Sequence, residues 1–100
     1  MATTTLGPDH YLELEYEVPS GRLVEFEIDA DRPVRSYVLS KRERDRFVQG
    51  KRDFEYFGGF PLPRSYQQQK LELPFSGWWY LVISNPSKDH SAKVRYDVFF

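Results

Sequence analysis

Residues 11–18 read Tyr-Leu-Glu-Leu-Glu-Tyr-Glu-Val, and this stretch decides the fold class. Apolar and acidic side chains alternate strictly along it. Because successive side chains of a β-strand point to opposite faces, the alternation predicts a strand with one buried face and one solvent-exposed face. Pro19-Ser20-Gly21 predicts a turn, and residues 22–29 then alternate in the same way. The two stretches together predict a β-hairpin with acidic outer faces. Because like charges directly opposite repel, either the two strands are not neighbours in one sheet or each glutamate row has a basic strand beside it.

Further short strands are expected along the rest of the chain. After a predicted turn at Asp31-Arg32-Pro33, the stretches that favour strands are 34–39, 54–57, 64–73, 78–84 and 91–100. Residues 78–84 are almost continuously apolar, which indicates a central strand covered on both faces. Short strands with turn signals every 8–12 residues or so are typical of an antiparallel β-sandwich. We therefore predict an all-β, jelly-roll-like sandwich of seven to eight strands, with a small closed barrel as the alternative.

One short helical turn interrupts this pattern, at residues 41–48. Ser40 and Glu43 have the spacing of a capping box, and Gly50 is expected to end the helix with a positive φ. Only Phe47 and Val48 offer the helix an apolar face, so one or two turns are expected.

The composition predicts one domain over residues 1–100, of which 1–9 are expected to be flexible. The chain has 100 residues and is 17% aromatic, whereas disordered chains are poor in aromatic residues. Trp78 and Trp79 are adjacent in a strand, so one of them should face outward and need a cover from a loop, the helix or a partner. The predicted core consists of Leu14, Tyr16, Val24, Phe26, Ile28, Val38, Trp78, Tyr80, Val82, Val94, Tyr96 and Val98.

No secretory or membrane-spanning segment is recognisable. The N-terminus lacks a basic stretch followed by an apolar one, and no apolar run approaches the roughly 20 residues of a membrane span. The chain also contains no cysteine, which excludes disulfides, a thiol nucleophile and cysteine-based metal sites. We expect a cytoplasmic protein.

The residues offer little material for catalysis. His10 and His90 are the only histidines, and both are expected at the surface outside strands. No glycine-rich loop precedes the helix, and Asp29-Ala30-Asp31 is the only candidate for calcium, with an ordinary Asx turn as the alternative. We predict a protein that is not an enzyme and that uses no cofactor or metal.

Charge is distributed unevenly. Residues 1–30 hold seven acids and one base, whereas residues 32–52 hold eight bases and two acids. This asymmetry indicates either an interaction surface or neutralisation between neighbouring elements. The candidate binding cations are Arg42, Arg44 and Arg46, accompanied by Lys41, Lys51 and Arg52. They could neutralise phosphates, but the acids among them and the overall charge of −1 make nucleic acid unlikely and favour a solvated or partner-facing loop.

A second candidate surface is an aromatic loop rich in glycine and proline. Its members are Tyr56, Phe57, Phe60, Leu62 and Tyr66. If exposed, these side chains would form a docking surface for a protein or a sugar. The alternative is that Phe57 and Phe60 close the end of the sandwich.

Two parts of the chain resemble known families. Leu-Pro-Phe-Ser-Gly-Trp-Trp-Tyr-Leu-Val-Ile-Ser-Asn-Pro, residues 73–86, and Ala-Lys-Val-Arg-Tyr-Asp-Val, residues 92–98, are similar to the ending of GOLD (Golgi dynamics) and bacterial pre-peptidase C-terminal domains. The middle of the chain, over 34–39, 47–50 and 56–59, resembles more closely an uncharacterised bacterial β-sandwich family found beside TIR or other effector domains. The likeness spans residues 11–99 and rests on turn glycines and core aromatics.

The resemblance implies a non-catalytic accessory or protein-interaction module, working with an effector in a bacterial defence or signalling system. A protein partner or self-association is therefore expected, with no membrane. The alternatives are a small-ligand or carbohydrate-binding module that uses the loop 56–66, and a nucleic-acid binder that uses the basic segment 41–52.

Overall fold

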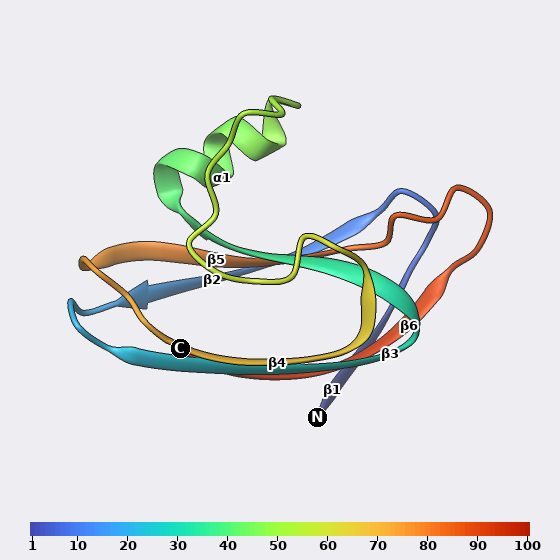
Figure 1. The fold of residues 1–100 in the computed structure, drawn as a ribbon, viewed down its shortest axis with the longest axis horizontal. Helices are drawn as coiled ribbons and strands as arrows, with labels where there is room; N and C mark the ends of the chain where they lie inside the picture. Colours follow the sequence, from blue (N-terminus) through green and yellow to red (C-terminus); the bar gives the residue numbers. More distant parts are fainter.

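The computed structural model describes residues 1–100 and is mostly antiparallel β-structure with one short helix, as the sequence predicts (Figure 1). It has six strands and not the predicted seven to eight. The elements are β1 (Ala2–Leu6), β2 (Tyr11–Val18), β3 (Leu23–Ser40), α1 (Lys41–Val48), β4 (Arg64–Glu72), β5 (Gly77–Ser84) and β6 (Ala92–Phe99).

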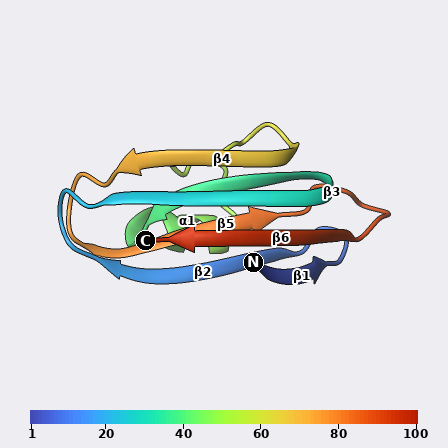
Figure 2. The ribbon, with the colours of Figure 1, turned by 90° about the horizontal axis from the view of Figure 1, so that it is seen from below.

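The long strand β3 belongs to both halves of the molecule. Its first half pairs with β4 on one side and β6 on the other, and β6 pairs in turn with β1. Its second half, Arg35–Ser40, pairs with β5, which pairs with β2, so the predicted hairpin between β2 and the start of β3 is wrong. Because one strand runs through both halves, the sheet curls into a half-barrel, and a clear division into the two stacked sheets of the predicted sandwich is absent (Figures 1 and 2).

The prediction of a turn at Asp31-Arg32-Pro33 is wrong, because β3 continues through these residues. Ladder pairing with β6 ends at Ala30, and pairing with β4 shifts register between Asp29 and Val34. Pro33 therefore lies where no ladder bond needs its missing N–H. Asp31 Oδ1 accepts a hydrogen bond from the backbone N–H of Lys93 at 2.8 Å, so this aspartate fastens β3 to β6.

The concave side of the sheet holds the main hydrophobic core. Most of the predicted core residues are buried there or partly buried against it. The exceptions are Trp78, which has 42% of its surface exposed, and Tyr80 and Val82. Trp79 lies in the core instead, 1% exposed, together with Leu81 and Ile83. The neighbours Tyr80 and Val82 are buried on the opposite, convex face. Since β5 is covered on both faces, its periodicity could not show which face was inner.

The first nine residues include a strand of the sheet. Ala2–Leu6 pairs with β6 over five register positions, and Leu6 reaches the core. Beyond it, the buried amide of Asn85 donates hydrogen bonds to the carbonyl oxygens of Leu6, Gly7 and His90 at 2.8–3.2 Å. This strand was not predicted within segment 1–9, which was expected to be flexible, because its threonines carry little hydrophobic signal.

Helix α1 and the loop that follows it fold back over the convex face of β3, β5 and β2, and we call residues 41–61 the flap (Figure 1). Ser40 is the N-cap, but its side chain makes no capping hydrogen bond, so the capping box is not formed. Gly50 follows the helix with φ at 78°, as expected. Phe54–Phe57 is loop and not the predicted strand; Phe54 packs on the convex face, whereas Phe57 packs against Trp79. The eight residues of this single helix are too few and too charged to cross a membrane.

Candidate functional site

An aromatic cluster fixes the flap to the sheet. Phe47, on the last turn of α1, packs edge-on against Tyr11 of β2 with ring centroids 5.1 Å apart. Phe47 also lies 5.9 Å from Tyr37 of β3 and 5.3 Å from Phe54 of the loop. The cluster covers the buried side chains of Leu39, Tyr80 and Val82. The convex face thus has its own small core, which holds the flap in place.

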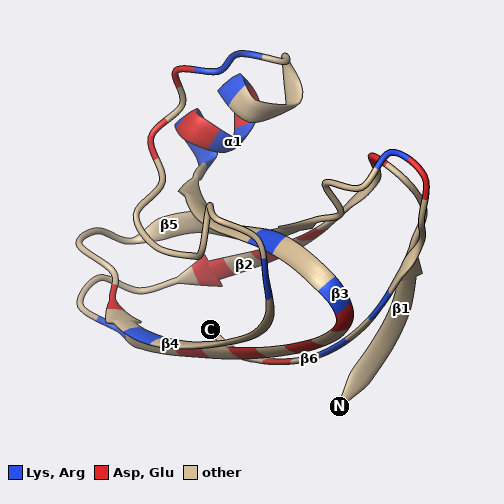
Figure 3. Ribbon diagram, turned by 45° about the vertical axis from the view of Figure 1, so that its right-hand side comes forward, with Lys and Arg blue, Asp and Glu red and all other residues tan.

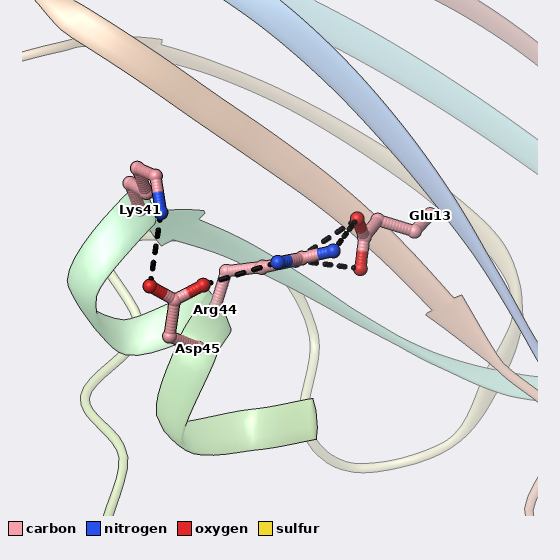
Figure 4. A network of polar contacts seen from close by, with 4 residues as sticks. All are labelled: Glu13, Lys41, Arg44 and Asp45. Carbon is pink, nitrogen blue, oxygen red and sulfur yellow. Dashed lines mark hydrogen bonds and ion pairs between the residues drawn. The ribbon is translucent and has the colours of Figure 1, made fainter. Parts of the chain in front are cut away.

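An arginine of the flap forms an ion pair with β2 (Figure 4). Arg44 donates to both carboxylate oxygens of Glu13, with Nη2 at 2.8 Å from Oε1 and Nε at 3.0 Å from Oε2. The same guanidinium lies over the ring of Tyr80, 5.1 Å from its centroid. Two parallel charge-assisted bonds of this kind fix the orientation of the helix on the sheet.

Further ion pairs form within the flap. Asp45 accepts hydrogen bonds from Lys41 Nζ and from Arg44 Nη1, both at 3.0 Å. These two cations lower the pKa of its carboxyl group. Hydrogen bonds from Arg44 to Glu13, and then to Asp45, raise the pKa of the guanidinium, which stays charged. Arg46 pairs with Asp53 at 2.5 Å. Of the three predicted binding arginines, Arg44 and Arg46 are thus engaged inside the protein, and Arg42 alone has no carboxylate partner.

Beside this cluster an open groove of about 560 Å³ runs between the flap and β3. We call it the basic groove. Its lining residues are Arg35, Tyr37, Phe47, Gly50, Lys51, Arg52, Phe54, Tyr56 and Pro61. The second half of β3 supplies one wall, and the loop after α1 supplies the other.

The charge of the basic groove is uniformly positive. None of the ion pairs in the protein involves Arg35, Lys51 or Arg52, and no acidic residue lines the groove. All three side chains belong to exposed residues. Figure 3 shows these basic segments on β3 and on the loop beyond α1. Cations left unpaired beside aromatic rings provide a site for an anionic group.

The structure separates the predicted aromatic surface into different places. Tyr56 lies in the basic groove, 47% exposed and edge-on to Tyr37 at 5.8 Å. Phe57 packs against Trp79 at 5.8 Å on the other side of the flap. Phe60 packs toward the core against Phe26, under the guanidinium of Arg64.

The remaining two predicted residues lie apart from the groove. Leu62 is 78% exposed in the loop. Tyr66, on β4, donates its hydroxyl to Glu27 at 2.8 Å on the outer surface of the sheet, and this bond raises its pKa. The aromatic loop is therefore not one surface.

Sequence reasoning missed Arg35, Tyr37 and Phe54 as groove residues. A signal for the first two was present, because Arg35 and Tyr37 lie on the outward face of a strand whose inward residues include Val34 and Val38. No sequence signal placed that strand beneath the basic segment.

No model of a known protein family matches this chain, and no curated protein matches it either. The resemblance to bacterial sandwich domains therefore stays a prediction.

Proposed function

We propose that the protein is a non-catalytic interaction module that binds an acidic segment of a protein partner in the basic groove. The observation that carries the proposal is the set of three cations, Arg35, Lys51 and Arg52, which surround an aromatic groove and have no acid of their own. Electrostatic complementarity of this kind steers a partner into the groove and fixes its register. The family resemblance suggests an effector as that partner, and this part of the proposal rests on the resemblance alone.

A protein partner fits the rings of the groove better than a nucleic acid does. Single-stranded nucleic acids stack their bases on open aromatic faces. Here Tyr37 packs against Phe47, Phe54 and Tyr56 with centroids 5.2–5.9 Å apart and ring planes inclined by 48–84°, so these rings already pack against one another. Only Tyr56 exposes much of its surface. Three free cations in a protein of net charge −1 also match a short acidic segment better than a phosphate backbone.

The electrostatics of the flap fit a structural role for Arg44 and Asp45. An acid or base that works at neutral pH needs a pKa near 7. The hydrogen bonds around Arg44 raise its pKa and those around Asp45 lower its pKa, so both groups move away from that range. They serve to hold the flap, and thereby the groove, in one shape.

Fluorescence anisotropy of a labelled short peptide rich in aspartate and glutamate tests the proposal. We expect saturable binding that weakens by roughly tenfold or more in the Arg35→Gln/Lys51→Gln/Arg52→Gln variant, since each exposed ion pair is worth up to about 1 kcal/mol. The matched control is Arg22→Gln/Lys88→Gln/Lys93→Gln, which removes the same charge at exposed residues outside the groove and should bind normally.

Two results would contradict the proposal. Equal losses in the groove variant and the control would show that only net charge matters. Binding of labelled oligothymidylate but not of the peptide would favour the nucleic-acid alternative instead.

A further inference from the structure

A second, smaller pocket lies on the other side of the flap from the basic groove. It has a volume of about 150 Å³. Its lining residues are Ser40, Glu43, Glu55, Tyr56, Phe57, Phe75 and Trp79. We call it the acidic pocket. Segment 55–57 separates the two sites, and Tyr56 lines both.

Aromatic rings form most of the acidic pocket. Trp79 is buried below it, and its indole N–H donates to the carbonyl oxygen of Phe75 at 3.0 Å. Phe75 and Phe57 lie against Trp79 with centroids 4.9 Å and 5.8 Å away and planes inclined by 35° and 64°. The rings of Phe57 and Phe75 remain about half exposed, as does Tyr56. Exposed aromatic rings attract cations through the negative faces of their quadrupoles.

The charge of the acidic pocket is opposite to that of the basic groove. Its only ionisable carboxylates are Glu43 and Glu55, and no basic residue lines it. Glu55 forms no ion pair. The side chain of Glu43 is 15% exposed, its Oε2 has no hydrogen-bond partner, and its closest cation is Arg46, whose Nε lies 3.8 Å from Oε1. The carboxylates of the pocket are therefore only partly neutralised.

We propose that the acidic pocket binds a quaternary ammonium group. Its volume has room for a small group such as a nitrogen with four attached carbons. Such a cation carries no N–H group, so it needs no hydrogen-bond acceptor when it leaves water. It is recognised by ring faces and by nearby negative charge, which are what the pocket offers.

Isothermal titration with choline and with its neutral isostere 3,3-dimethylbutanol tests the proposal. The two molecules share a shape and differ in charge. We expect choline to bind roughly two- to fivefold more tightly, as a cation–π contact at a solvent-exposed site implies. Glu43→Gln/Glu55→Gln should remove most of this preference, whereas Glu17→Gln/Glu72→Gln, which makes the same charge change at exposed strand residues, should keep it.

Replacing a ring provides an independent measurement. Phe57→Leu keeps an apolar side chain but removes a π-face, so we expect choline to bind several-fold more weakly while thermal stability changes little. Equal affinity for choline and its isostere, or tighter binding of methylguanidinium than of choline, would overturn the proposal. Binding of the acidic peptide to the basic groove should be unchanged in Glu43→Gln/Glu55→Gln, so the two sites can fail separately.

Discussion

Replacing Gly59 by alanine should detach the end of the flap from β3. Gly59 has φ at 106°, and a Cβ added there would lie 2.4 Å from the carbonyl oxygen of Ser36. The next residue, Phe60, exchanges two backbone hydrogen bonds with Ser36, at 2.9 Å and 3.0 Å. The loop cannot move away from the new methyl group without breaking both of these bonds.

The magnitude follows from a comparison with Gly50. Gly50 also has a positive φ, 78°, but a Cβ there would meet nothing within 4 Å. Gly50→Ala should therefore cost only the conformational term, about 1 kcal/mol. Gly59→Ala has this cost too, and it also loses two hydrogen bonds of about 1 kcal/mol each and introduces the strain of the contact. The total destabilisation is then about 3–4 kcal/mol.

Urea unfolding followed by tryptophan fluorescence measures both variants against the natural protein. A domain of this size has a free energy of unfolding of about 5–15 kcal/mol, so the larger loss is easily resolved. Gly59→Ala should also weaken the binding of the acidic peptide, because it displaces the loop that carries Tyr56 and forms one wall of the basic groove. Equal destabilisation by the two substitutions would refute the role assigned to the contact with Ser36.

Four further substitutions test the core and its electrostatics. Trp79→Ala should cost about 3–5 kcal/mol in chemical unfolding, because the side chain is fully buried. Trp78→Ala, at a side chain that is 42% exposed, should cost under about 1 kcal/mol. Similar losses for the two variants would contradict the assignment of Trp79 to the core. Asn85→Ala should cost about 2–3 kcal/mol by calorimetry, since three carbonyl oxygens lose their donor, and a neutral effect would argue against that network. Burial, and then a hydrogen bond with Glu15, raises the pKa of Tyr80 above 10.0, so its contribution to stability is present below pH 10 and is lost as the pH rises through the higher folded value. Tyr80→Phe should therefore flatten the alkaline decline in a pH series of unfolding measurements, and an unaltered slope would contradict this.

Alternation along the sequence predicts the strands that have one wet face. β2 and the first half of β3 begin and end within a few residues of their expected positions. Alternation is less informative where both faces are covered, which is why Trp78 was assigned to the core in place of Trp79. The bend of β3 was missed because Pro33 normally signals a turn, whereas here it lies between two ladders that do not need its N–H.

The site was less predictable than the fold. The sequence does not show that any base of segment 41–46 has a distant carboxylate partner. In the structure, Arg44 forms an ion pair with Glu13, which is 31 residues away along the chain. Only the curvature of the sheet and the packing of Phe47 bring these residues together. For the same reason, Arg35 could not be joined to Lys51 and Arg52 before the path of the flap was known.

Amide chemical shifts recorded while the acidic peptide is titrated into the labelled protein test the central claim most directly. That claim is that the flap and the second half of β3 form one anion-binding groove. The account predicts that the largest shift changes fall on Arg35, Tyr37, Lys51, Arg52 and Phe54, with little change along β4, β6 and β1. Changes confined to β4, β6 and β1, or spread evenly over the surface, would contradict it.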